Sequence, residues 1–316
     1  MSAVQVAEHQ QSNVRSPHRS RLGRDWQLGY ALLLPAVVVV LGLIAYPLGY
    51  AVWLSLQDIK VGGQGHFIGF ANYVRILFDR QSQIHGLFWN SVKVTFLYTG
   101  GALIGKFIIG MVSALILNAE IRARRFWRTL LFVPWAIPAV VSAFSWKWIY
   151  NDVNGVLNTI LLRLGLIKDP ILFLSDPRLA LWSVLIAVIW QGAPFWIMTF
   201  LAGLQAIPRE LYEAAQIDGA TSAQTFWRIT LPNLMPVIIV TTMLSAIWTS
   251  NAIQYVYVLT NGGPANVTET FPILAYHQGM QAYDLGIAAT IPLLFFPLFA
   301  VMIYFLTRRM LQQEER

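Results

Sequence analysis

The chain has 316 residues, of which 56% are hydrophobic and only 12% are charged. A soluble domain of this size carries about 25% charged residues, so this composition leaves too little polar surface for water and indicates a membrane protein. The sequence contains no cysteine, which excludes disulfides, thiolate metal sites and cysteine nucleophiles. The five histidines are scattered without the spacing of metal ligands.

Residues 1–28 are polar and unpatterned, which predicts a mobile tail. Six apolar stretches then follow, each of them long enough for a transmembrane helix. Their ranges are 30–56, 92–118, 130–150, 179–201, 236–259 and 285–306. We therefore predict an all-α membrane protein with six transmembrane helices in one domain at 29–310, and a short C-terminal end at 311–316. In the first stretch, Pro35 and Pro47 are candidate kink sites.

The basic residues predict how these helices are oriented. With the N-terminus in the cytoplasm, thirteen basic residues fall in cytoplasmic segments and six in outer segments. The outer loop at 260–284 has no Lys or Arg. The positive-inside rule then places both termini in the cytoplasm. Topology, with some attraction to anionic membrane lipid, thus accounts for the net charge of +7 without nucleic acid.

A polar segment at 207–232 separates the fourth and fifth apolar stretches. Its pattern predicts a short helix at 209–217 that ends at Asp218-Gly219, because glycine adopts a left-handed cap without strain. Thr221 and Gln224 have the form of a capping box, which predicts the start of a second short helix. One interpretation is an amphipathic helix pair that only lies on the lipid headgroups.

The wider pattern of this segment favours a second interpretation. Ile-Pro-Arg-Glu-Leu-Tyr-Glu-Ala-Ala-Gln-Ile-Asp-Gly-Ala begins at Ile207, and Ile229-x-Leu-Pro follows ten residues after Gly219. This pattern resembles the EAA coupling segment of ABC importer permeases, in their carbohydrate-uptake branch. The resemblance implies a type I importer transmembrane domain over about residues 30–310, and a helix that enters a cleft on a separate ATPase. It assigns that contact to Glu210, Glu213, Ala214, Ala215, Asp218 and Gly219.

The outer turn after the fifth stretch carries a second resemblance. Leu-Thr-Asn-Gly-Gly-Pro at 259–264 is a turn signal, because its glycines allow positive φ and its proline fixes the exit. It is similar to the sequence of one of two non-identical sugar-permease subunits. The resemblance implies a bacterial inner-membrane assembly of this chain with a second homologous permease, two ABC ATPase subunits and an extracytoplasmic substrate-binding protein.

In this family ATP and Mg belong to the ATPase, so we expect no catalytic residue, metal or cofactor on this chain. The chain lacks the extra spans and large outer insertion of the maltose-system subunit. It looks instead like shorter relatives that carry disaccharides, oligosaccharides, polyols or glycerol-phosphate esters. The resemblance thus implies a carbohydrate-like solute and points away from maltose.

Aromatic and small polar side chains at membrane depth are the candidates for a solute path. Aromatic rings can stack on sugar rings, while hydroxyl and amide groups can bond the sugar's OH groups. On the fifth stretch the candidates recur at one-face helical spacing. The alternative is that tryptophans lie in interfacial belts and small polar residues pack helices. The candidates are Trp190, Gln191, Phe195, Trp196, Ser245, Trp248, Thr249 and Ala252, with Asn251, Gln254 and Tyr255 on a neighbouring face.

Two other features of the sequence bear on this interpretation. The string from Gly100 to Phe107 has the G-x4-G-K form of a P-loop, but Phe107 replaces the Ser/Thr and the string lies inside an apolar stretch. Gly101 and Gly105 are better explained as close-packing positions, while Lys106 either snorkels or faces the interior. No Asp or Glu lies deep in any stretch, which disfavours an ion-coupled secondary transporter, the main alternative.

Overall fold

The computed structural model describes residues 25–119 and 121–314. The chain divides into two compact units, Met1–Trp53 and Leu54–Arg316. The first unit holds α2 (Asp25–Val40), the π-helical turn η2 (Leu41–Ala45) and most of α3 (Tyr46–Ser55). These form one uninterrupted helix, and its irregular turn lies between the two prolines expected to bend it. Most of the expected N-terminal tail lies outside the described residues.

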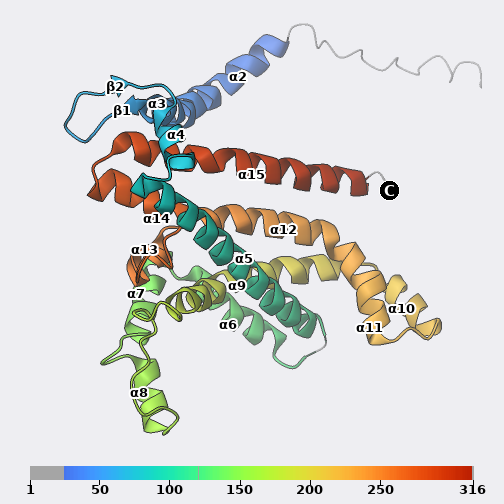
Figure 1. Cartoon of the computed structure of the whole chain (residues 1–316). Helices are drawn as coiled ribbons and strands as arrows, with labels where there is room; N and C mark the ends of the chain where they lie inside the picture. The colour runs from blue at the N-terminus through green and yellow to red at the C-terminus, as the bar shows by residue number, and fades with distance from the viewer. Residues whose placement is uncertain (1–24, 120, 315–316) are drawn as a thin grey trace, which may run out of the picture. The chain divides into compact units, whose positions relative to one another are not determined.

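The second unit is built on three long helices, α5 (Gln83–Asn118), α9 (Ala180–Ala206) and α12 (Leu231–Asn251), which pack on one another. Figure 1 shows α5 crossing α9 below α12. The close approach of α5 and α9 depends on glycine, because a Cβ on Gly105 would lie 2.4 Å from Cδ1 of Ile189. Gly101 faces Leu185 in the same way. The prediction that these glycines pack helices is therefore confirmed.

The third apolar stretch differs from the prediction of one straight span. It contains α6 (Arg124–Ala136) and α7 (Ala139–Ile149), whose axes bend by 93° at the break between them. Pro138 explains the break, since a proline has no N–H to donate and pushes the preceding residue out of helical conformation. Ile137 accordingly has an extended ψ of 130°.

The polar segment forms one of the two predicted short helices as a separate element, α10 (Arg209–Ile217). The second, α11 (Ser222–Thr225), continues through the π-helical turn η3 (Phe226–Thr230) directly into α12. The second helix therefore starts where predicted, but it is not short, because it continues into α12. Pro232 lies inside this continuous helix, and the wide π-helical turn directly before it accommodates the N–H that proline lacks.

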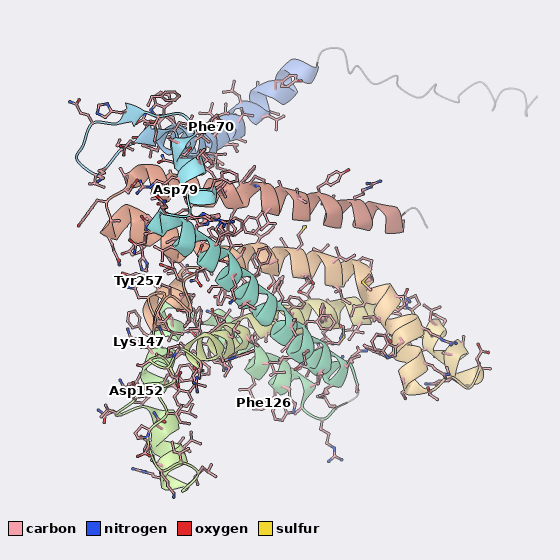
Figure 2. All side chains as sticks on the ribbon, viewed as in Figure 1. Phe70, Asp79, Phe126, Lys147, Asp152 and Tyr257 are labelled. Carbon is pink, nitrogen blue, oxygen red and sulfur yellow. The ribbon has the colours of Figure 1, made fainter. Side chains whose placement is uncertain are left out.

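Several short elements lie at the ends of the long helices away from α10 and α11 (Figure 1). Strands β1 (Gln57–Asp58) and β2 (His66–Phe67) pair antiparallel, with Gln57 opposite Phe67. Figure 2 shows Lys147, Asp152 and Tyr257 on the side of the unit away from α10 and α11. The short helical elements are α4 (Ala71–Leu77), α8 (Val156–Arg163), α13 (Gln254–Leu259), α14 (Phe271–Tyr276) and the π-helical turn η4 (His277–Gln281).

Within the described residues, four helical stretches are long and apolar enough to cross a membrane. They are Gly29–Ser55, Gln83–Asn118, Ala180–Ala206 and Ser222–Leu259. The bent pair α6 and α7 makes a fifth if the two helices form one span. At the sixth predicted stretch, α15 (Leu285–Glu314) has a shorter apolar part, Leu285–Val301. The structure is thus mostly helical with four or five spans by length and composition.

Candidate functional site

A cavity of about 400 Å³ lies among α5, α9 and α12, beside the break between α6 and α7. It is lined by most of the residues proposed for the solute path: Gln191, Phe195, Ser245, Trp248, Thr249 and Ala252. Gln254 and Tyr255, from the neighbouring face, also line it. The structure therefore brings residues of the fourth and fifth predicted stretches together around one space.

One wall of the cavity is aromatic. The rings of Phe195 and Trp248 lie 5.3 Å apart with an interplanar angle of 60°. Trp135, from the end of α6, lines the same cavity. Such rings offer flat apolar surfaces to a ligand of matching shape.

Lys106 forms the polar floor of this cavity, although it was not among the residues proposed for the solute path. Its side chain is 5% exposed, and Nζ donates a hydrogen bond of 2.8 Å to Oγ1 of Thr249. The stem lies against Gly192, where a Cβ would come within 2.4 Å of Cε of Lys106. Of the two placements considered for Lys106, the structure shows the interior one.

Tyr98 also lines this cavity, and it was not proposed from the sequence. Its side chain is fully buried, and its hydroxyl has no hydrogen-bond partner among the described residues. Nothing in the sequence separates this tyrosine from the other aromatic residues of α5. Lys106 did give a signal, because a lysine inside an apolar span is unusual.

Two of the proposed path residues do not line the cavity. Trp196 is 1% exposed, and its Nε1 donates a hydrogen bond of 3.1 Å to Oγ of Ser245. It packs edge-on against Phe107 and Phe200 in the core. Trp190 instead packs against Trp146 of α7, with ring centroids 5.7 Å apart.

The break between α6 and α7 is tied to the cavity by polar side chains. Nε2 of Gln191 donates a hydrogen bond of 3.1 Å to the carbonyl oxygen of Ile137. On the same side, the Tyr255 hydroxyl donates one of 2.7 Å to Oγ of Ser142. The break therefore has its carbonyl satisfied, and it presents backbone to the cavity between two fixed side chains.

The coupling segment has the local structure that its sequence predicts. Gly219 follows α10 with a φ of +73°, the left-handed cap expected at this position. Thr221 and Gln224 form the expected capping box at the start of α11. The two helices are linked by a contact of 3.3 Å between the hydroxyls of Tyr212 and Thr230.

The residues assigned to ATPase contact differ in exposure. Ala215 is buried against the rest of the unit, whereas the other assigned residues, Glu210, Glu213, Ala214, Asp218 and Gly219, are exposed. Ile217 at the tip of α10 is 87% exposed. The segment therefore presents an exposed apolar tip with acidic residues beside it, anchored by Ala215.

A second pocket, of about 690 Å³, lies beside α10 and is rich in arginine. Arg124, Arg128 and Arg209 line it together with Glu213. With its amide oxygen turned toward the arginines, Gln205 accepts hydrogen bonds of 2.7 Å from Arg128 and 2.9 Å from Arg124. Basic residues expected on the cytoplasmic side thus gather at the coupling end of the unit.

The outer turn is held by its own polar contacts. Asn261 and Gly262 both have positive φ, as the Asn-Gly-Gly-Pro signal predicts. His277 Nδ1 lies 2.9 Å from Oε1 of Glu269, and His277 Nε2 lies 3.3 Å from Oδ1 of Asn261. Burial raises the pKa of the Glu269 carboxyl, and the hydrogen bond with His277 acts against that shift.

Comparison with known proteins identifies the class of molecule that this fold and cavity define. Residues 106–313 match the family described as binding-protein-dependent transport system inner membrane component. The chain belongs to this family. It is a permease subunit of an ABC importer, and it resides in the inner membrane. ATP hydrolysis in such importers belongs to a separate subunit, so the permease itself is not an enzyme.

Curated relatives cover nearly the whole chain. The trehalose/maltose transport system permease protein MalF of Thermococcus litoralis is 38% identical over 276 residues, 87% of this chain and 90% of that protein. The sulfoquinovosyl glycerol transport system permease protein SmoG of Agrobacterium fabrum is 32% identical and covers 87% of each chain. The comparisons give no support to an ion-coupled secondary transporter.

Solved structures agree with the family. A bacterial ABC transporter for import of the acidic polysaccharide alginate has a TM-score of 0.76 and 26% identity, covering 92% of this chain and 97% of that one. The alginate transporter in complex with its alginate pentasaccharide-bound periplasmic protein gives a TM-score of 0.75 and 25% identity, covering 92% of this chain and 96% of that one. The type I importer fold implied by the coupling segment is therefore shown.

Proposed function

We propose that this permease carries a sugar, an oligosaccharide or a related polyol or glycerol-phosphate-like solute through the 400 Å³ cavity. The main support for this proposal is the lining of the cavity. The aromatic rings of Phe195 and Trp248 line it together with side chains that carry hydroxyl and amide groups. Sugars present apolar ring faces and many OH groups, so such a lining matches their chemistry. The cavity volume lies in the range of small-molecule sites.

The names of the relatives favour the same class of solute. They include trehalose and maltose, sulfoquinovosyl glycerol and alginate. The Thermococcus litoralis relative is matched over 90% of its length and is named for maltose as well as trehalose. The shortness of the chain is therefore no argument against maltose. These solutes include both neutral sugars and an acidic polysaccharide, so the charge of the solute has to be read from the cavity.

The assembly that we propose contains this chain, a second homologous permease and two ATPase subunits that hold ATP and Mg. An external binding protein delivers the solute, as a periplasmic protein accompanies the alginate transporter. In our proposal the exposed residues of α10, Glu210, Glu213, Ala214, Asp218 and Gly219, contact the ATPase. Ala215 seats the helix on the permease, because it is buried. The coupling segment is 207–232.

The coupling segment can transmit movement because it is continuous with the cavity. α11, η3 and α12 form one helix, and α12 carries Ser245, Trp248 and Thr249. The contact of Tyr212 with Thr230 ties α10 to the start of that helix. A displacement of α10 by ATPase closure would therefore move the cavity wall. This is a rigid-body route between the two sites.

For topology we propose six spans with both termini in the cytoplasm. The domain then extends over residues 29–310, between an N-terminal tail at 1–28 and a cytoplasmic end at 311–316. The gathering of Arg124, Arg128 and Arg209 at the coupling end favours this orientation by the positive-inside rule. The α6–α7 pair would make one broken span, and α15 would make the sixth.

The test is reconstitution of the purified assembly in vesicles with its binding protein. The proposal predicts that ATP hydrolysis rises when the binding protein carries a sugar, and that labelled sugar enters the vesicles. Omitting ATP, or omitting the binding protein, are the controls. If no sugar stimulates hydrolysis while an amino acid or a metal complex does, the proposed solute class is wrong.

A further inference from the structure

The cavity has an excess of hydrogen-bond donors, and one of them is a cation. Lys106 has three N–H donors and uses one of them on Thr249. The Tyr98 hydroxyl is fully buried, lines the cavity and has no partner among the described residues. A buried donor without a partner costs free energy, and Lys106, which is 5% exposed, can still bind a further acceptor.

No acid among the described residues lines the cavity beside this lysine. The residues that line the cavity include no Asp or Glu. Within the part of the chain that the structure describes, the ion-paired residues are His277 and Glu269, in the outer turn. A charged side chain at membrane depth is costly unless it is paired. Thr249 supplies a neutral oxygen only, and it leaves the charge of Lys106 uncompensated.

The ammonium group of Lys106 and the aromatic wall line the same cavity. Lys106 comes from α5 and is fixed by Thr249 of α12 and by the close contact with Gly192 of α9. Phe195 and Trp248 come from α9 and α12 and line the same cavity. A solute can therefore place a ring on the aromatic faces and a substituent at the ammonium.

We propose that Lys106 forms a subsite for a negatively charged group on the transported solute: a carboxylate, a sulfonate or a phosphate. The ammonium supplies a charge-assisted hydrogen bond, the stronger kind of hydrogen bond in a water-poor site. This inference rests on the proposed function, and it narrows the solute to acidic sugar derivatives.

The test compares four hexoses that differ only at carbon 6: glucose, glucuronate, glucose 6-sulfonate and glucose 6-phosphate. Each is titrated into the purified importer assembly without the binding protein, so that only the permease site is measured. Quenching of tryptophan fluorescence reports binding, because Trp248 and Trp135 line the cavity. We expect an anionic hexose to bind at least about tenfold more tightly than glucose, from one charge-assisted bond.

Three variants locate the effect. Lys106→Met should reduce the preference for the anionic hexoses to near unity, whereas Lys106→Arg should keep it. Tyr98→Phe removes a buried hydroxyl elsewhere on α5 and should keep the preference. The matched control is Lys93→Met, which removes the same charge from an exposed position on the same helix. That control should keep the full preference.

The wild-type assembly alone can overturn the proposal, whether or not the variants assemble. Equal binding of glucose and the anionic hexoses by wild type would contradict it. So would an anionic preference that survives in Lys106→Met. If no hexose binds while sugar-loaded binding protein still stimulates ATP hydrolysis, the anion subsite is refuted and the importer function stands. If stimulation is absent as well, the proposed function has failed.

Discussion

Trp196 donates its indole N–H to Oγ of Ser245 across 3.1 Å, and this bond joins α9 to α12 directly behind the cavity. Trp196 is 1% exposed, so its ring is packed into the core between Phe107 and Phe200. Ser245 lines the cavity from the other side of this bond. Both residues were proposed for the solute path from the sequence. In the structure Ser245 forms part of the cavity wall, whereas Trp196 supports that wall from behind.

Trp196→Phe should lower stability without changing solute recognition. The substitution keeps an aromatic ring in the core and removes the donor to Ser245. Interhelical hydrogen bonds within membranes contribute about 0.6 kcal/mol on average and up to about 1.7 kcal/mol. We expect a small fall in the thermal unfolding temperature of the purified assembly, with transport KM within about twofold of wild type. A large change in KM at unchanged unfolding temperature would contradict this account of Trp196.

Trp248→Ala should raise the transport KM and leave assembly of the complex unchanged, the reverse of what is expected for Trp196→Phe. Trp248 lines the cavity and packs on Phe195, so its loss removes an aromatic face from the proposed path. An aromatic contact adds about 0.5–1.5 kcal/mol beyond area burial, which corresponds to a rise in transport KM of about twofold to tenfold. Recovery of the assembled complex should be normal.

The control for Trp248→Ala is Trp182→Ala. Trp182 lies on α9, is 64% exposed and does not line this cavity. Uptake assays over a range of solute concentrations would compare the two variants. An unchanged KM in Trp248→Ala, or an equal change in both variants, would remove Trp248 from the path.

Gly219→Asp should uncouple transport from ATP hydrolysis. Gly219 has a φ of +73°, a conformation that side chains other than glycine adopt only with strain of about 1–2 kcal/mol. A Cβ there would meet nothing within 4 Å, so the cost comes from the backbone and from what docks on the segment. We expect membrane insertion to be normal, while ATPase association or coupled uptake is lost.

Gly165 offers a matched control for this substitution. It follows α8 as Gly219 follows α10, has a φ of +68° and likewise has nothing within 4 Å of a built Cβ. Gly165→Asp therefore imposes a similar strain far from the coupling segment. It should transport normally. If Gly165→Asp loses coupled uptake to the same extent, backbone strain alone explains the effect, and the docking assignment loses its support.

The sequence predicted the features whose patterns are local and regular. The long apolar helices, the capping box of Thr221 and Gln224, and the left-handed Gly219 each depend on a few neighbouring residues. Most proposed path residues were also found, because Ser245, Trp248, Thr249 and Ala252 follow one helical face. These predictions needed only helix periodicity, the side-chain hydrogen bonds of a capping box and the conformational freedom of glycine.

Other features depend on contacts between distant parts of the chain and could not be predicted. Trp190 and Trp196 lie on the right helix, but the packing partners Trp146 and Phe107, from other helices, decide that they face away from the cavity. Lys106 faces inward because Thr249, 143 residues later, accepts its hydrogen bond. Pro138 could have indicated the break between α6 and α7, yet the apolar run around it favoured one straight helix.

Glu269 should make stability depend on pH. Burial raises its pKa in the folded protein above the ordinary value of 4.5, and His277 acts against this shift. The folded state therefore holds the proton more tightly than the unfolded state, so the stability contributed by this group falls as pH rises through the raised pKa. Glu269→Gln has no such proton.

Thermal unfolding of wild type and Glu269→Gln, measured from about pH 4 to about pH 7, isolates this contribution. We expect wild type to lose stability relative to the variant as pH increases. A wild-type advantage that grows with pH would mean that the ion pair with His277 outweighs burial of the carboxylate.

Co-purification tests the central claim, that this permease is driven by a separate ATPase docked on α10. Tagged wild-type chain, Glu213→Lys and the control Asp169→Lys would each be purified gently from the native membrane, and their partners identified. Asp169 is an exposed acid after α8, so Asp169→Lys makes the same change of charge away from α10. Glu213 lies beside Arg124, Arg128 and Arg209, so Glu213→Lys replaces the acid of that pocket with a further cation. We predict an ATPase and a second permease with wild type and with Asp169→Lys, and loss of the ATPase alone from Glu213→Lys. A wild-type chain that purifies without an ATPase, or an ATPase held equally by all three proteins, would contradict the claim.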